Sequence, residues 1–157
     1  MDRTIQINSE LILHVNRILI LLSYFGNQKS IKTSLDKIML FDFYMKYPSV
    51  MIDDEDLVNN FSYYDYYSYY HWKPNREEYH LYLRYLTAKR LISRIISGNE
   101  FIYQITQDGT DIIEGLNSSY SKSLKSVALH IKKHVSKLSD TKIENEIIKR
   151  SLSRINS

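Results

Sequence analysis

The chain lacks cysteine and has little glycine or proline: its 157 residues include no Cys, four Gly and two Pro. Missing thiols exclude disulfide bridges, thiolate metal sites and a cysteine nucleophile. They also fit a reducing compartment, so we expect a cytoplasmic protein. Scarce glycine and proline indicate few turns and long helices.

A long hydrophobic run is also missing. The most apolar stretch, 11–25, is interrupted by His14, Asn16 and Arg17. It is shorter than the ~20 residues that a membrane-spanning helix needs. The first ten residues are polar and include two acids, so they predict no signal peptide. We therefore expect no membrane association.

Tyrosine is abundant and charge is unevenly distributed. Six of the 14 tyrosines lie between Tyr63 and Tyr70. Residues 1–75 carry seven Lys or Arg and nine Asp or Glu, whereas residues 76–157 carry fourteen and nine. The basic second half suits a polyanion or an acidic protein surface, but a net charge of +3 is too small to identify a nucleic-acid-binding protein.

Apolar spacing predicts two helices in the first third of the chain. The first covers 10–25, is apolar on most sides and ends at Gly26. The second begins at Thr33 or Ser34, either of which can cap a helix, and stops before Pro48. Residues 48–75 show no regular period, so we expect an acidic, aromatic connection with one short helix near 55–60.

A third helix and a hairpin follow. Asn75 should cap a helix over 76–91, with Lys89 and Arg90 in its last turn. Apolar β-branched residues up to Ile96, a turn at 97–100 and an alternating strand at 101–105 predict a β-hairpin. Thr106 then closes the second strand and can cap the next helix, near 111–116, while Gly109 permits close approach in its first turn.

This order of elements predicts a winged helix-turn-helix fold, mainly α with a small hairpin as the wing. A basic helix over 119–138 and a last helix from about Asp140 follow it. Both carry narrow apolar stripes, as expected for helix-on-helix packing. We therefore predict a winged-helix domain over 10–116, with an insertion at about 48–75, and a C-terminal helical extension over 117–157. The stripe residues are Leu124, Val127, Ile131, Val135 and Leu138, then Ile143, Ile147, Leu152 and Ile155.

Four segments resemble the middle component of the ABC three-component systems, bacterial defence operons that include the Lamassu type. The family shows an N-x-I-L-x-L-L helix, an L-x-K-x-x-L-x-D-[FY] helix, a variable insertion and a wing that ends in Y-x-x-T-x-x-G. The insertion differs, because the family has a Gly/Pro/His-rich loop where residues 50–75 are acidic and tyrosine-rich. The matching segments are HVNRILILLSYF (14–25), SLDKIMLFDFYM (34–45), YLTAKRLISRI (85–95) and FIYQITQDGTDIIEGLNSSYSKSLKSVALHI (101–131).

The resemblance implies a non-catalytic accessory subunit. Such a subunit would bridge an SMC-like coiled-coil ATPase to an effector, commonly a nuclease, and would meet DNA through the complex. The alternative is a winged-helix transcription regulator that dimerises through residues 119–155. That alternative needs helix 76–91 as a DNA-recognition helix, whereas the rich apolar and tyrosine content of this helix favours a structural role.

Two sets of side chains are candidate contact residues. The tyrosine-rich run is either a binding platform, because aromatic side chains give large contact area at low entropic cost, or a flap that covers the first two helices. The basic residues are either a solvated face or contacts to nucleic acid or an acidic partner. The platform candidates are Tyr63, Tyr64, Tyr66, Tyr67, Tyr69, Tyr70 and Trp72, and the basic candidates are Arg84, Lys89, Arg90, Lys125, Lys132 and Lys133.

No pattern predicts a metal, a cofactor or a catalytic centre. His130 and His134 have metal-ligand spacing on a helix, but two lysines lie between them, so we expect solvent-facing histidines. The acidic run 53–56 lacks the glycine bend of a calcium loop and is expected to be a solvated turn. No nucleophile–base set or Gly-rich phosphate loop is present, so we predict that the protein is not an enzyme.

Overall fold

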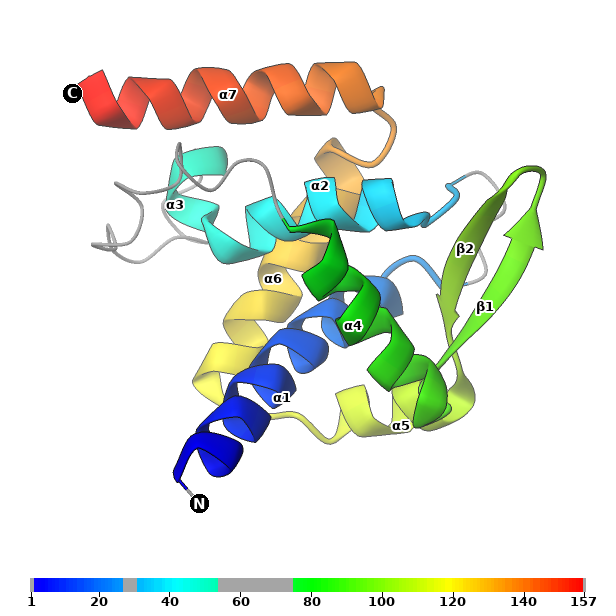
Figure 1. The fold of residues 1–157 in the computed structure, drawn as a ribbon. Helices are drawn as coiled ribbons and strands as arrows, with labels where there is room; N and C mark the ends of the chain where they lie inside the picture. Colours follow the sequence, from blue (N-terminus) through cyan, green and yellow to red (C-terminus); the bar gives the residue numbers. More distant parts are fainter. Residues whose placement is uncertain (1, 27–30, 54–74, 157) are drawn as a thin grey trace.

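The computed structural model describes residues 2–26, 31–53 and 75–156. These residues form helices and one antiparallel hairpin in the order of a winged helix, so the predicted fold class is confirmed (Figure 1). The elements are α1 (Asp2–Ser23), α2 (Leu35–Lys46), α3 (Pro48–Met51), α4 (Arg76–Ala88), β1 (Ile92–Ser97), β2 (Glu100–Ile105), α5 (Gln107–Glu114), α6 (Ser119–His134) and α7 (Asp140–Asn156).

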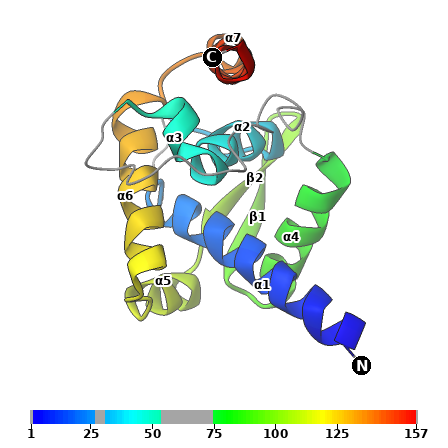
Figure 2. The ribbon, with the colours of Figure 1, turned by 90° about the vertical axis from the view of Figure 1, so that its left-hand side faces the viewer.

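Helix α1 is the centre of the molecule. It runs between α4 and α6 (Figure 2) and also contacts α2, α5 and β2. Neighbours on several sides explain why Ile18, Leu19, Ile20 and Leu21 are all buried, as the continuous apolar run predicts. The helix begins earlier than the predicted residue 10 and ends at Ser23, before a turn in which Gly26 has a φ of +50°.

Helices α2 and α3 meet at Pro48. The Ser34 side chain accepts a hydrogen bond from the Lys37 N–H, which confirms Ser34 as the N-cap of α2, and the helix ends before Pro48 as expected. The proline then starts α3 instead of an irregular connection, because its fixed φ suits the first position of a helix. The short helix predicted at 55–60 lies outside the described residues.

The hairpin and the N-cap of α4 lie where the sequence predicted them, but α4 ends earlier than predicted. Asn75 caps α4 by accepting a hydrogen bond from the Glu77 N–H, and Ile96 pairs with Phe101 near the hairpin turn. The helix ends at Ala88, because Arg90 has a φ of 60° that breaks helical geometry. Lys89 and Arg90 therefore follow α4 and do not lie in its last turn.

The junction between β2 and α5 confirms the roles predicted for its threonine and glycine. The Thr106 hydroxyl accepts a hydrogen bond from the Gly109 N–H at 3.1 Å, so α5 begins at Gln107 and not near residue 111. A Cβ atom on Gly109 would lie 2.3 Å from the carbonyl oxygen of Leu91. Only glycine permits this approach of α5 to the start of the wing.

Helices α6 and α7 complete one hydrophobic core. α6 packs on α1 and α2, whereas α7 lies across α2 and α3 (Figure 1). α6 ends at His134 and not at residue 138. On α7, Ile143 and Ile147 are buried as predicted, but the next buried residue is Ser151, and Leu152 is 41% exposed. No helix among the described residues combines the length and apolarity of a membrane span.

Candidate interaction site

A buried ion pair fixes α4 against α1 and α2. The Arg17 guanidinium donates from Nε to one oxygen of Asp42 at 2.7 Å and from Nη2 to the other at 2.8 Å. The hydroxyl of Tyr79 on α4 also donates to Asp42. Asp42 is fully buried. Its carboxylate therefore joins three helices.

The electrostatics keep this pair ionised. Burial opposes the charge of Asp42, yet the Arg17 guanidinium lowers the pKa of that carboxyl below its usual value. Burial together with the nearby Asp42 charge raises the pKa of the Tyr79 hydroxyl, which remains a proton donor. These groups hold the helices together and are not exposed to a ligand, so the candidate site must lie on an outer surface.

The exposed face of α4 meets the wing at a cleft of about 320 Å³. Two arginines from different elements line it, Arg84 on α4 and Arg94 on β1, together with His80. The other lining residues are Leu83, Thr87, Ala88 and Tyr103, and no carboxylate is among the described lining residues. The cleft therefore combines cationic side chains with apolar and aromatic ones.

The outer part of the wing continues this surface with exposed apolar side chains. Ile96 is 73% exposed and its cross-strand partner Phe101 is 45% exposed. The guanidinium of Arg94 lies over the Phe101 ring, 4.3 Å from its centroid. Aromatic and arginine side chains in one patch are typical of the centres of protein interfaces. We call Arg84, Arg94, Ile96 and Phe101 the wing patch.

The predicted basic contacts are spread over the structure. Arg84 lines the cleft, whereas Lys89 follows α4 and lies over the Tyr85 ring. On α6, the Lys125 ammonium donates to two carbonyl oxygens at the end of α5, at 2.8 and 2.9 Å, and so has a structural contact that the sequence did not reveal. The remaining members of the set are the exposed Arg90 and Lys133 and the half-buried Lys132.

The other candidate residues fall partly outside the described chain. The platform candidates, Tyr63 to Trp72, lie outside the described residues, as do positions 54–56 of the acidic run. Asp53 accepts two hydrogen bonds from Arg150 of α7. His130 and His134 lie with ring centroids 4.9 Å apart, and the described residues contain no group of three metal-ligating side chains.

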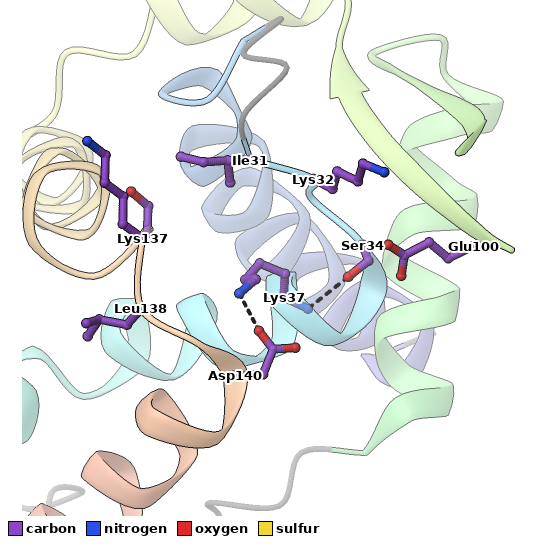
Figure 3. A pocket seen from close by; sticks show the side chains of 9 residues that line it. Ile31, Lys32, Ser34, Lys37, Glu100, Lys137, Leu138 and Asp140 are labelled. Carbon is purple, nitrogen blue, oxygen red and sulfur yellow. Dashed lines mark hydrogen bonds and ion pairs between the residues drawn. The ribbon is translucent and has the colours of Figure 1, made fainter. Parts of the chain in front are cut away.

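A second cleft, of about 560 Å³, lies where the segment before α2 meets the hairpin turn and the α6–α7 connection. Figure 3 shows Lys37 directed toward Asp140, with which it forms an ion pair. Lys32 and Lys137 point away from one another in the same view. Because these cations do not converge on one point, we place the candidate site at the wing patch.

The fold and this surface define a winged-helix-like protein, mainly α, with a cationic and apolar face at its wing. Over residues 7–156 the chain matches the ABC-three component (ABC-3C) system Middle Component 2 family. The chain belongs to this family, which confirms the resemblance to a three-component defence system. Neither the curated proteins nor the solved structures include a match.

Proposed function

We propose that this protein is the non-catalytic bridging subunit of a Lamassu-type defence complex in the cytoplasm, where it links an SMC-like coiled-coil ATPase to an effector such as a nuclease. The observation that carries the proposal is the family match over residues 7–156, because a middle component of a three-component system is expected to have protein partners. In this proposal, DNA is met by the assembled complex.

The exposed side of α4 favours a protein partner over a DNA groove. The exposed residues of this helix are Arg76, Glu77, Glu78, His80, Leu81, Arg84 and Ala88, and Leu81 is 51% exposed. A helix that enters the major groove presents cationic and hydrogen-bonding side chains to phosphates and base edges. Arg76 is paired with Asp36, and two glutamates and an exposed leucine beside Arg84 fit that task poorly, which weakens the alternative of a transcription regulator.

Co-purification tests the bridging role. The tagged chain would be co-expressed with the proposed ATPase and effector subunits, and the eluate would be analysed by size-exclusion chromatography. We expect one assembly with the ATPase and the effector, and no assembly of those two when this chain is omitted. Separate elution of all three proteins would overturn the proposal, and tight sequence-specific DNA binding by the chain alone would favour the regulator.

The tyrosine-rich run is a second contact candidate, because of its aromatic content. We predict that Tyr66→Ala combined with Tyr69→Ala abolishes assembly while circular dichroism of the isolated chain stays unchanged. Loss of the folded state in the double variant would instead identify the run as a cover for the core.

The non-catalytic assignment has its own test. The purified chain alone should neither hydrolyse ATP nor cleave linear DNA, and both activities should appear only with the partner subunits present. DNA cleavage that follows this chain through every purification step would contradict the assignment.

A further inference from the structure

Strand β1 has one edge without a strand partner among the described residues. Its neighbour β2 lies in the middle of the small sheet, because Ile102 of β2 forms a bridge to Ser34 and the Tyr103 N–H donates to the Thr33 carbonyl at 2.9 Å. Within the described part of the chain, β1 pairs with β2 alone and lies on the outer side of the hairpin (Figure 1). Its free edge faces away from the segment before α2.

The register shows which peptide groups point outward. The Thr106 N–H donates to the Leu91 carbonyl at 3.0 Å, so these two residues form a hydrogen-bonded pair. Bonded and non-bonded pairs alternate along an antiparallel ladder. Arg94 and Ile96 therefore stand in non-bonded pairs, with their N–H and C=O groups directed away from β2. The outward N–H of Tyr103 on β2 obeys the same alternation.

This edge has few of the features that usually prevent strand pairing: it carries one charged residue, Arg94, but no proline, lysine or bulge. Native edge strands are protected by proline, by lysine or by a bulge. β1 has the sequence ISRIIS and pairs with β2 in unbroken register. Ile95 is 39% exposed and Ile96 is 73% exposed beside the free edge. Free backbone groups next to exposed isoleucines are the arrangement to which an extended peptide adds as a strand.

The charge beside the edge selects the chemistry of such a peptide. Arg84 and Arg94 line the cleft between α4 and β1 with His80, and the described lining residues include no acid. A strand laid along β1 passes the mouth of this cleft. Carboxylate side chains on that strand would accept charge-assisted hydrogen bonds from the guanidinium groups, and an apolar side chain would pack on Ile96 and Phe101.

We propose that an extended, acidic segment of a partner subunit adds to the outer edge of β1 as a further antiparallel or parallel strand. The backbone of this segment forms hydrogen bonds with the outward peptide groups of Arg94 and Ile96. Its acidic side chains face Arg84 and Arg94, and its apolar side chains cover the wing patch. This inference rests on the proposed bridging function and names the surface through which one partner is held.

Amide hydrogen exchange measured on the assembled complex tests strand addition directly. The N–H groups of Arg94 and Ile96 have no ladder partner among the described residues, so they should exchange quickly in the free chain. In the complex with the ATPase and the effector, we expect their exchange to slow by at least about tenfold. The amide of Ile95 faces β2 and should be protected in both states, which provides an internal control.

Two pairs of variants separate backbone pairing from side-chain contact. Ile96→Pro removes an outward N–H that the fold does not use, whereas Ile96→Thr keeps it with a β-branched side chain. We expect Pro to weaken partner binding at least about tenfold more than Thr does. Arg84→Glu should also weaken binding, and Lys122→Glu, an exposed charge reversal on α6 outside the candidate contact set, should not.

The outcomes distinguish this inference from the proposed function. If the complex assembles while the Arg94 and Ile96 amides exchange as in the free chain, strand addition is wrong and the bridging role stands. If no complex assembles, both fail. Protection of these amides in the concentrated isolated chain, together with a dimer in sedimentation, would identify a second copy as the occupant. Protection on adding DNA alone would identify nucleic acid.

Discussion

At the scale of a single residue, Asp42 joins three helices, α1, α2 and α4. It is fully buried, is paired with Arg17 and accepts a hydrogen bond from Tyr79. A buried ion pair is costly to form and more costly to break, because removing one partner leaves the other charge buried without compensation. The orientation of α4, and with it the cleft at the wing, therefore depends on this carboxylate.

Asp42→Asn should lower the free energy of unfolding by about 3–5 kcal/mol, because Arg17 would remain buried beside a neutral amide. Urea denaturation followed by circular dichroism measures the change. Asp36→Asn is the matched control, since Asp36 forms an exposed pair with Arg76 and such pairs contribute at most about 1 kcal/mol. Equal losses in the two variants would contradict the role assigned to Asp42.

His14 makes stability depend on pH. Its ring stacks on Tyr82 at 5.0 Å between centroids, and burial, reinforced by the Arg17 charge, lowers its pKa from the usual 6.5. The unfolded chain then takes up the proton first as pH falls, so folding stability should decrease below pH 6.5 until His14 is also protonated in the folded state. His14→Gln should flatten this part of the stability–pH curve, and an unchanged slope would refute the assignment.

At the scale of elements, the position of α5 against the hairpin is fixed by the N-cap at Thr106 and the close backbone approach at Gly109. The Thr106 side chain ends β2 and starts α5, and its hydroxyl also donates to the Arg90 carbonyl at 2.7 Å. Gly109 brings the first turn of α5 against the residue that precedes β1. The wing is therefore anchored at its base from both strands, while its tip projects from the helices (Figure 1).

Gly109→Ala should destabilise the fold by about 1–3 kcal/mol, because the new Cβ would meet a backbone oxygen that cannot move independently. Gly115→Ala is the control, since its Cβ would find nothing nearer than 3.5 Å and should change stability by less than about 0.5 kcal/mol. Thermal denaturation of both variants measures the difference. A larger loss for the Gly115 variant would contradict this account.

For the whole molecule, the buried side chains of α1, α2, α4, α6 and α7 belong to one core. The sequence predicts a boundary between a winged-helix domain, which ends at residue 116, and a helical extension that begins at residue 117, and this boundary stays a prediction. Ile131 of α6 and Ile143 of α7 are fully buried against the earlier helices, so residues 1–116 alone would expose the surfaces that these helices cover. We expect the two parts to be one cooperative unit.

The full chain should accordingly unfold in a single transition, with near-ultraviolet and far-ultraviolet circular dichroism giving coincident curves. A fragment of residues 1–116 should show no cooperative transition. Two separated transitions in the full chain, or a stably folded fragment, would show instead that residues 117–157 are an independent extension.

The sequence by itself determined the winged-helix order, the caps at Asn75 and Thr106 and the place of the hairpin, because these depend on local geometry and short spacing. It narrowed the cap of α2 to Thr33 or Ser34, and the structure identifies Ser34. It also determined the family through segments that form the core. It could not predict that Asp42 is buried with Arg17, since 25 residues separate the partners along the chain. Nor could it bring Arg84 and Arg94 to one cleft.

Only the tertiary structure decided which face of the wing is open. Ile92 and Ile96 share one strand and one side of it, yet Ile92 is 2% exposed and Ile96 is 73% exposed, because α4 covers the base of the hairpin and not its tip. Periodicity gives the side of a strand on which a residue lies, but burial depends on what packs there. The free edge of β1 follows in the same way, from the segment before α2 pairing with β2.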